Sequence, residues 1–504
     1  MNITSGIFLF FLFIVIACQT ISNSRAWREA VLLTASAIFL YTYAPHKELV
    51  EALPLFLFSF VGYGFSWCLA VNHRKKFLLP FSCAIVIAIF TYMKGYSIIP
   101  SKLMLENPIL SVGASYILFR IIQVMVDISE GFLTFNFRIS TYFLYLFYFP
   151  SFLSGPIQRF QDFDDQMSSP KPLTKNSVSS SIARASDGFI LALVIAPFTF
   201  YLFETFKAML EIGEGGGALM KRFPLWLMQI FTNPSGDNFL RHLVIYSLMS
   251  VLYTLFLYFN FAGYMGIVIS ASRLMGYTIP ENFNKPILSS NFLDFWSRWH
   301  ITLAEWFKTY VFTPLTQTLL TRHPNKSFAP FIFVLSLLVT FLTMGIWHGT
   351  TFWFFVYGLF LGIGVSINRL YQLIATKYFG KIGYANLKSR VLYSFSCRTL
   401  TFTYFCIALM TWWVGTDFEW NYLLKKLAIL GCLFLFIFIF GLVSAFLTIH
   451  HFGSKLIGNL SNLIELRIPL MRNSSFLSAF KIVVVIYAIF LTNTKVPDFI
   501  YKGF

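Results

Sequence analysis

Charged residues are scarce in this sequence, and their scarcity excludes an ordinary soluble protein. Asp, Glu, Lys and Arg together make up 12% of the 504 residues, whereas hydrophobic residues make up 57%. An ordinary soluble domain contains roughly 25% charged and 45–50% apolar residues. We therefore expect most of the chain to lie in a lipid bilayer.

Segments of alternating apolar and polar residues are also missing, which argues against a membrane β-barrel. Residues 53–71 and 428–447 are instead continuously apolar, and a helix needs about 20 such residues to cross the hydrocarbon core. Apolar runs of this kind recur along nearly the whole chain. The sequence predicts an all-α, polytopic integral membrane protein with about ten to twelve transmembrane helices.

No polar linker, internal repeat or convincing signal peptide divides the chain. The apolar stretch 7–18 has no basic flank and no small-residue cleavage site, so we expect it to remain as the first span. We interpret residues 1–504 as a single membrane-embedded domain. It has N-terminal spans in 1–141, a motif-bearing core in 142–370 and C-terminal spans in 371–504.

The six cysteines form no C-x-x-C pair and share no spacing with histidine that suits a metal ion. All of them lie in or beside apolar segments, where cysteine behaves as a small hydrophobic residue. We expect no metal site and no tightly bound cofactor.

Basic residues outnumber acidic ones by 38 to 21, and their positions indicate the orientation of the chain. Cytoplasmic loops of membrane proteins normally carry the excess of Lys and Arg. Placing the basic loop 73–76 inside puts the N-terminus and Lys94 outside, the segments 273–326 and 369–398 inside, and the acidic turn 417–419 and the C-terminal tail outside. A phosphate-bearing donor or an acidic carrier protein would benefit from the same inner charge, and the charge count does not separate these explanations. We expect a multi-pass protein of the cytoplasmic membrane.

Two parts of the chain do not fit a simple count of spans. Residues 109–126 and 142–153 cannot both cross the bilayer if Lys94 is outside and the loop 159–184 is inside. We expect one of them to be half-inserted, and irregular backbone at membrane depth indicates a cavity lined by protein or water. The stretch 243–276 has two interpretations, which are one span with an in-plane segment or a broken pair of helices.

One of the eight histidines stands apart. His348 lies between the apolar runs 331–342 and 352–367, where an ionisable side chain is costly unless it faces a polar cavity. Gly345 and Gly349 flank it and allow a turn or the close approach of a ligand. The structural alternative is that His348 caps a turn through a backbone carbonyl group.

The segment 292–315 carries a second candidate. Its aromatic and charged residues alternate as in a helix that lies in the plane of the membrane interface. The apolar stripe and the charged positions are Phe295, Trp299, Leu303, Trp306 and Tyr310, with Arg298, Glu305 and Lys308. His300 lies within this segment, directly after Arg298 and Trp299.

Four stretches together carry a resemblance to a known family. They are Tyr148-Phe149-Pro150 running to Gly155-Pro156-Ile157-Gln158-Arg159; Tyr258-Phe259-Asn260-Phe261-Ala262-Gly263-Tyr264; Pro280-Glu281-Asn282-Phe283-Asn284-Lys285-Pro286 leading into Phe295-Trp296-Ser297-Arg298-Trp299-His300-Ile301-Thr302-Leu303; and Gly345-Ile346-Trp347-His348-Gly349. In order and spacing they resemble the membrane-bound O-acyltransferases, in particular the bacterial branch that includes the membrane components of alginate O-acetylation and teichoic-acid D-alanylation. A W-x-R-W-H pattern followed 48 residues later (348 − 300) by W-H-G is rare by chance.

The resemblance implies a set of helices, half-inserted segments and interfacial helices around a central funnel or tunnel. It implies that His348 and His300 are catalytic. It also implies a substrate channel lined by Trp347, Trp299, Arg298, Asn260 and Glu305. Asn260 stands where the bacterial branch usually has Asp, and Pro314-Leu315-Thr316-Gln317 stands where acetylating members typically have Pro-Leu-Gly-Gly-Asn-Arg. These departures leave the donor and the acceptor open.

We expect His348 to take the proton of an acceptor hydroxyl, because a neutral imidazole is a suitable base near physiological pH. His300 would orient it or share the proton. No G-x-S-x-G elbow and no convincing Cys/His pair indicates a covalent intermediate. The 17 residues from Phe331 to Trp347 cover about 25 Å at 1.5 Å per residue. We therefore expect His348 toward the outer side and His300 near the inner side, with a pore between them.

The sequence thus predicts transfer of a short acyl group, acetyl or alanyl, from a cytoplasmic thioester donor to a hydroxyl of a cell-envelope polymer or partner protein. The donor co-substrate would be acetyl-CoA or an acyl carrier protein. Membrane lipids would surround the chain, the resemblance implies an extracytoplasmic acyltransferase as partner, and no nucleic acid is expected.

Two alternatives remain open. The first is an acyltransferase whose acceptor is a lipid, a sterol or a protein. The second is a transporter or lipid flippase, for which Arg120 and Asp127 would be translocation residues. These two residues are two turns apart, and we favour the interpretation that they form a structural pair.

Overall fold

The computed structural model describes residues 3–43, 52–72, 77–96, 111–211, 238–414, 436–437 and 439–448. Within these residues the chain is helical, apart from loops and one isolated antiparallel bridge between Phe283 and Trp299. The predicted all-α class is therefore confirmed for the described part of the chain. The predictions for the turn 417–419, the loop 73–76 and the C-terminal tail lie outside the described residues.

The helices follow one another along the chain as α1 (Gly6–Gln19), α2 (Arg25–Tyr43), α3 (Leu53–Val71), α4 (Leu78–Lys94), α5 (Ser111–Ser129), α6 (Ile139–Phe147), α7 (Phe149–Phe152), α8 (Phe160–Ser168), α9 (Lys175–Ile190), η4 (Leu191–Ile195), α10 (Ala196–Glu211), α12 (Asn238–Leu274), η6 (Pro286–Leu288), α13 (Phe292–Trp296), α14 (Ile301–Phe307), η7 (Lys308–Phe312), α15 (Thr313–Arg322), η8 (Lys326–Phe328), α16 (Ala329–His348), α17 (Phe352–Ser389) and α18 (Val391–Trp413). A further short apolar helix spans Ile439–Thr448.

Five of the described helical segments are long and apolar enough to cross a membrane. They are Leu53–Val71, Lys175–Met209, His242–Leu274, Lys326–His348 and Phe352–Ser389. Three shorter apolar helices, Gly6–Gln19, Leu78–Lys94 and Ile439–Thr448, accompany them. The chain is therefore a multi-pass membrane protein, although the described residues do not give the predicted total of ten to twelve spans.

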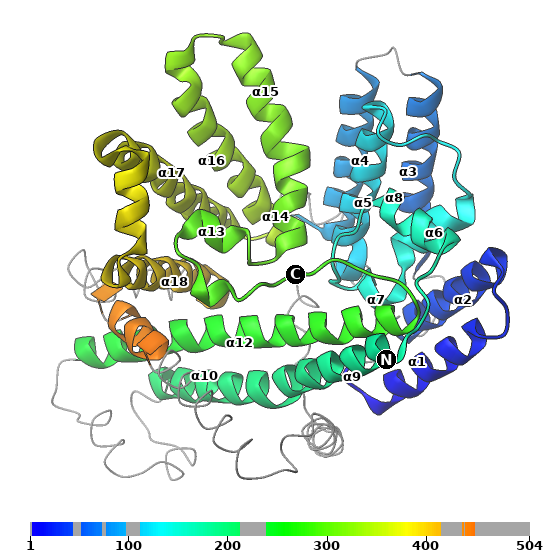
Figure 1. Cartoon of the computed structure of the whole chain (residues 1–504), viewed down its shortest axis with the longest axis horizontal. Helices are drawn as coiled ribbons and strands as arrows, with labels where there is room; N and C mark the ends of the chain where they lie inside the picture. The colour runs from blue at the N-terminus through cyan, green and yellow to red at the C-terminus, as the bar shows by residue number, and fades with distance from the viewer. Residues whose placement is uncertain are drawn as a thin grey trace.

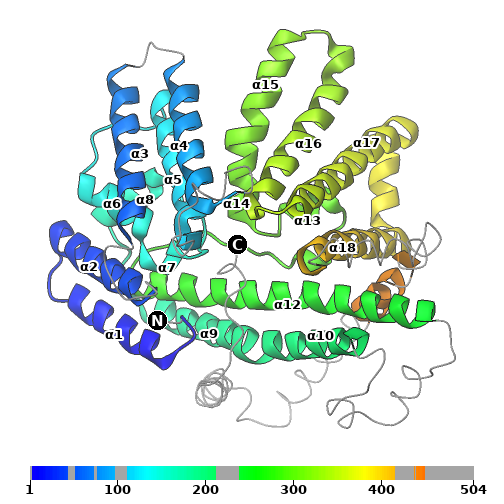
Figure 2. The ribbon, with the colours of Figure 1, turned by 180° about the vertical axis from the view of Figure 1, so that it is seen from behind.

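Two groups of helices stand on one side of a long transverse layer (Figure 1). The layer consists of α12 beside the continuous run α9–η4–α10, and both views show these helices lying side by side (Figure 2). One group contains α3, α4 and α5, and the other contains α15, α16 and α17. The adjoining ends of α3 and α4 and those of α15 and α16 lie on the same side of the molecule.

The first irregular region contains one full helix and one broken helix. α5 has 19 residues, whereas α6 has 9 residues and ends at Phe147, before the short α7 with its Pro150. Nine residues cover only roughly 14 Å. The segment 142–153 is therefore too short to cross a bilayer, as predicted for one of the two segments.

The buried side chain of Arg120 holds this break together. Its guanidinium donates to the carbonyl oxygens of Tyr145 and Leu146, both at 2.8 Å, and to the carbonyl oxygen and hydroxyl of Ser151 at 3.1 and 2.7 Å. Asp127 instead accepts from the Tyr310 hydroxyl at 3.0 Å. The predicted structural pair of Arg120 and Asp127 is wrong, because the break between α6 and α7 leaves carbonyl groups that need a donor in an apolar interior.

Two predictions about helix continuity are also wrong. The stretch 243–276 is neither a broken pair nor a span with a separate in-plane segment, because α12 runs unbroken over 37 residues. The segment 292–315 is not one interfacial helix, because α13 ends at Trp296 and α14 begins at Ile301. Aromatic periodicity alone did not reveal that Ser297 to His300 leave the helical path.

Close packing of α16 against α17 positions the end of α16. A Cβ atom on Gly345 would lie 2.5 Å from the Cα atom of Gly358, and one on Gly358 would lie 2.6 Å from the carbonyl oxygen of Phe341. Small residues let two membrane helices approach this closely. The crossing point is therefore fixed three residues before His348.

Candidate active site

His348 is the last residue of α16 and is buried among aromatic rings. Its side chain is 4% exposed, and its ring centroid lies 4.7 Å from that of Trp347, 5.0 Å from Trp412 on α18 and 5.6 Å from Tyr357 on α17. Three spanning or long helices therefore meet at this imidazole. Gly349 follows in an extended conformation and ends the helix.

His300 lies in the break between α13 and α14 and has an unusual backbone conformation. Its φ and ψ angles are 45° and 51°, in the left-handed region that residues with a side chain seldom adopt. The residue is 1% exposed. Such strain at a buried polar residue is a common feature of functional sites.

Both ring nitrogens of His300 face polar atoms. Nδ1 lies 3.3 Å from Oδ1 of Asn282, and Nε2 lies 3.4 Å from the hydroxyl of Tyr116. The Phe261 ring packs edge-on at 4.9 Å. His300 lies outside the five apolar spans, and burial lowers its pKa to about 3. The imidazole is therefore neutral at physiological pH.

Asn282 organises the backbone around His300. Its Oδ1 accepts from the backbone N–H of Thr302 at 3.1 Å and from the Thr302 hydroxyl at 2.9 Å, and its carbonyl oxygen accepts from Ile301 N–H at 3.0 Å. The hydroxyl of Thr302 also accepts from the backbone N–H of Ile157 at 3.0 Å. Because Oδ1 is an acceptor for these donors, the Nδ1 atom of His300 is the protonated nitrogen and Nε2 is left to accept from Tyr116.

Tyr116 connects the surroundings of the two histidines. The Tyr116 hydroxyl contacts His300, and the Tyr116 ring packs edge-on against Trp347 at 6.2 Å. Tyr116 therefore contacts both His300 and the residue directly before His348. The placement of His348 toward the outer side and His300 near the inner side, with a pore between them, stays a prediction.

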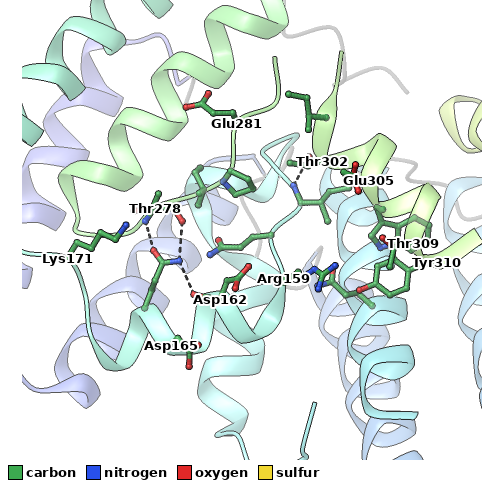
Figure 3. Close-up of a pocket in the computed structure, with 18 residues that line it drawn as sticks. Arg159, Asp162, Asp165, Lys171, Thr278, Glu281, Thr302, Glu305, Thr309 and Tyr310 are labelled. Carbon is green, nitrogen blue, oxygen red and sulfur yellow. Dashed lines mark hydrogen bonds between the residues drawn. The ribbon is translucent and has the colours of Figure 1, made fainter. Parts of the chain in front are cut away.

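A polar cavity of about 610 Å³ is lined by Ile301 and Thr302, which directly follow His300, and Thr302 is labelled in Figure 3. It lies between α8, the loop 278–281 and the α14–η7 segment, and Thr302 forms part of its wall, two residues from His300. Gln166 joins two of its walls through hydrogen bonds with the N–H and carbonyl of Thr278 at 2.5 and 3.1 Å. Neither His300 nor His348 lines this cavity, so a funnel that reaches the imidazoles stays a prediction.

The cavity wall is rich in uncharged hydrogen-bonding groups and contains charges of both signs. The uncharged groups include Gln123, Gln158, Gln166, Thr302, Thr309 and Tyr310. Arg159 and Lys171 provide positive charge, whereas Asp162, Asp165, Glu281 and Glu305 provide negative charge. Glu281 is paired with Arg184, and Glu305 with Lys308 at 3.1 Å, so part of the negative charge is neutralised.

The five predicted channel residues occupy different surroundings. Glu305 lines the polar cavity, whereas Arg298 pairs with Asp294 at 2.8 Å beside the α13 turn. Trp299 packs against Phe405 at 4.9 Å, Trp347 packs against Phe119 at 4.9 Å, and Asn260 is 5% exposed within α12. Their role in a substrate channel stays a prediction. Of the five, Glu305 is the residue that lines the polar cavity.

Sequence reasoning missed three residues that contact or organise the histidine pair. Tyr116 lies on α5, and Asn282 and Thr302 lie within the quoted stretches but received no role. The pattern P-E-N-F-N next to W-H-I-T offered a signal, since a side-chain amide in a loop suits several backbone donors. No sequence signal connected Tyr116 with His300, which is 184 residues further along the chain.

The helical membrane architecture and the two buried histidines indicate a class of membrane protein, and comparison with known families identifies it. The model of the MBOAT, membrane-bound O-acyltransferase family, matches residues 137–407, which is more than half of the chain. The chain therefore belongs to the membrane-bound O-acyltransferase family. This confirms the resemblance that the four sequence stretches carried.

Several curated relatives are similar to the chain. It is 31% identical to the teichoic acid D-alanyltransferase of Streptococcus thermophilus over 260 residues, which is 51% of this chain and 56% of the relative. It is 28% identical to the Bacillus subtilis teichoic acid D-alanyltransferase over 275 residues, 54% of this chain and 62% of the relative. It is 27% identical to the probable alginate O-acetylase AlgI of Pseudomonas fluorescens over 381 residues, 73% of this chain and 66% of the relative. The chain thus matches less than two thirds of the length of the two D-alanyltransferases.

Proposed function

We propose that the protein is an O-acyltransferase of the cytoplasmic membrane that moves a short acyl group, acetyl or alanyl, from a cytoplasmic thioester donor to a hydroxyl of a cell-envelope polymer or a partner protein. One observation supports this most directly. The two motif histidines, which are 48 residues apart in sequence (348 − 300), are both buried, and Tyr116 contacts His300 and packs against Trp347, the residue before His348. Thr302, two residues from His300, lines a polar cavity.

The reaction requires a base at the attacking oxygen. The acceptor hydroxyl oxygen attacks the thioester carbonyl carbon, and neutral His348 takes the hydroxyl proton as the new C–O bond forms. The C–S bond then breaks, and the departing sulfur receives that proton from His348, so that the products are an ester and a thiol. His300, held neutral by burial and fixed by Asn282, orients the site through Tyr116. Trp347 would form a wall of the channel.

The polar cavity supports a cytoplasmic donor. It lies beside the segment 273–326, which the excess of basic residues predicts to be inside. The thioester arm of coenzyme A or of an acyl carrier protein contains amide groups, which match the Gln, Thr and Tyr side chains of the cavity wall. An extracytoplasmic acyltransferase as partner, and the polymer that receives the group, are further parts of this proposal.

The test uses the full-length protein reconstituted in sealed vesicles with its native membrane extract. Labelled acetyl-CoA, and labelled acetyl and D-alanyl carrier proteins, are supplied on the cytoplasmic side, and transfer of the label is measured. The variants are His348→Ala and His348→Gln, with His323→Ala as the matched control because His323 is an exposed loop histidine. We expect His348 variants that remain folded to lose about a hundredfold or more in rate. Retained transfer by either folded variant contradicts the proposal.

The same vesicles distinguish the alternative functions. Label that remains with envelope polymer or an extracytoplasmic protein supports the proposed acceptor, and label that is extracted into organic solvent supports a lipid or sterol acceptor. Uptake of substrate into vesicles without any thioester donor, together with no acyl transfer, would indicate a transporter or flippase. In that case both the chemistry and the role of His348 proposed above are wrong.

A further inference from the structure

The end of α4 carries a buried lysine whose contacts neither the sequence motifs nor the reaction above explains. Lys94 is the last residue of α4 and is 9% exposed. Lysine is rare at buried positions among membrane helices, and where it occurs it is generally functional. Sequence reasoning used Lys94 only as a marker of the outer side.

Lys94 and the nearby Tyr96 bind the end of α16. The Lys94 ammonium donates to the backbone carbonyl of Trp347, and the Tyr96 hydroxyl donates to the backbone carbonyl of Ile346 at 2.9 Å. The ammonium also lies 6.0 Å from the centroid of the Trp347 ring. These two carbonyl groups belong to the two residues that directly precede His348.

The end of α16 needs such donors. The last four carbonyl groups of any α-helix have no partner within the helix, and many helices solve this with a left-handed residue that turns the chain back over its own end. α16 does not use that solution, because Gly349 is extended, with φ −164° and ψ 171°. In an apolar surrounding each unpaired carbonyl group is costly, and Lys94 and Tyr96 provide donors to the last turn.

The geometry of α4 suits this task. Gly95 adopts the left-handed conformation, with φ 70°, at the end of α4. The backbone turn at Gly95 lets Lys94 and Tyr96, on either side of it, both reach α16. A residue with a side chain at position 95 would favour another backbone conformation. Lys94 and Tyr96 would then no longer both point toward the end of α16.

We propose that Lys94 and Tyr96 are positioning residues that hold the last turn of α16 and thereby set the orientation of His348. This proposal rests on the proposed function, in which His348 is the base. The pair acts through the carbonyl groups of Ile346 and Trp347, and touches neither donor nor acceptor. Misplacing a catalytic group by about 1 Å can cost about a hundredfold in rate, so loss of this support reduces turnover while donor binding at the cavity near Thr302 continues.

The test compares Lys94→Met, Lys94→Arg and Tyr96→Phe in the reconstituted transfer assay. Lys94→Met keeps the length and apolar stem but removes the donor, and we expect kcat to fall about tenfold to a hundredfold with the KM for the donor within about twofold. Lys94→Arg retains a cationic donor and restores most of the rate. Tyr96→Phe removes one oxygen atom, and we expect a fall of about threefold to tenfold, because one of the two hydrogen bonds remains.

The matched control is Lys388→Met. Lys388 lies in the last turn of α17, is exposed, and stacks 4.8 Å from the centroid of Tyr384. Like Lys94, it is a lysine at the end of a helix beside an aromatic ring, but it does not contact the end of α16. It therefore shows the effect of losing such a lysine away from His348. We expect wild-type kcat and KM for this variant.

A double variant separates positioning from general damage. If Lys94 acts through His348, Lys94→Met adds little to the loss already caused by His348→Ala, because residues that act as a unit are strongly non-additive. Multiplicative losses in the double variant would overturn the proposal. Wild-type kcat in folded Lys94→Met or in Tyr96→Phe, or an effect confined to KM, would also overturn it.

The variants also distinguish failure of the positioning role from failure of the proposed function. An inactive His348→Ala together with fully active Lys94→Met and Tyr96→Phe leaves the acyl transfer proposal intact and removes only the positioning role. An active, folded His348→Ala removes both. If Lys94→Met does not fold, Tyr96→Phe still decides the question, because it removes a single oxygen atom and wild-type kcat in that variant overturns the proposal.

Discussion

Asn282 forms a side-chain contact with His300. The two residues lie on neighbouring loop segments that run antiparallel to one another. The Oδ1 atom of Asn282 lies 3.3 Å from Nδ1 of His300, and backbone hydrogen bonds at 2.9 and 3.0 Å join Asn284 to Arg298 and Ile301 to Asn282. The first of the two histidines is therefore fixed by a loop rather than by a helix. Its left-handed backbone is maintained because several hydrogen bonds would be lost if it relaxed.

Thr302 provides a sensitive test of this network. Thr302→Val keeps the shape but removes the hydroxyl that accepts from Ile157 N–H and donates to Asn282. We expect a loss of about 1–3 kcal/mol in the free energy of unfolding, visible as a lower midpoint of thermal unfolding in detergent, and reduced transfer activity. Thr302→Ser keeps the hydroxyl and serves as the control. Equal stability and activity of the two variants would show that this network does not support His300.

Arg120 tests the broken helix. Arg120→Met leaves the carbonyl groups of Tyr145, Leu146 and Ser151 without their donor in a fully buried position. We expect destabilisation of about 3 kcal/mol or more, measured by intrinsic tryptophan fluorescence on heating. Arg322→Met, at an exposed helix end, is the control and should change little. A stable Arg120→Met variant contradicts the role given to this guanidinium.

The cavity can be blocked to test its link with the donor. Thr309 lines the cavity on η7, and Thr309→Trp inserts a large ring into its volume of about 610 Å³. We expect kcat/KM for the thioester donor to fall about tenfold or more, since the arm loses space, while the protein stays folded. Thr321→Trp on α15, at an exposed position, is the matched control. Unchanged donor kinetics in folded Thr309→Trp would exclude this cavity as the donor site.

The ion pair beside the α13 turn predicts a pH dependence of stability. Burial alone would raise the pKa of Asp294, but hydrogen bonds from Arg298 and Ser290, with the charge of Arg298, hold the pKa below its ordinary value of 3.8. A depressed pKa in the folded state contributes stability that is present above pH 3.8 and is lost as the pH falls through the folded value. The thermal midpoint of wild type should therefore exceed that of Asp294→Asn at neutral pH, and the difference should shrink below about pH 4. A difference that is constant from pH 3 to pH 7 contradicts this assignment.

Much of the fold could be predicted from the sequence, because long apolar runs identify the segments whose transfer into lipid is favourable. α3 spans the apolar run 53–71, and α16 contains the run 331–342. Of the two segments that could not both cross, 142–153 is the one divided into α6 and α7. The prediction failed where the backbone departs from a helix for tertiary reasons. The break before His300 is one example, because its aromatic stripe continues the helical pattern through Trp299.

The candidate site was likewise predicted only in part from the sequence. The motif stretches identified His300 and His348, since a histidine between apolar runs is costly and the surrounding residues are distinctive. The residues that contact each histidine were not predictable from the chain, and the expected pore between the two stays a prediction. Tyr116, which contacts the first and packs beside Trp347, lies on a helix that no motif marked.

By itself the sequence determined that this protein is an all-helical resident of the membrane, which family it belongs to, and which two imidazoles merit attention. Only the tertiary structure decided how those imidazoles are held. Lys94 reaches the carbonyl of Trp347 across 253 positions of sequence, and Asn282 fixes His300 through a loop pairing. The physical reason is that burial and helix formation depend on neighbouring residues, whereas the partner of a buried donor or acceptor depends on which distant helix packs beside it.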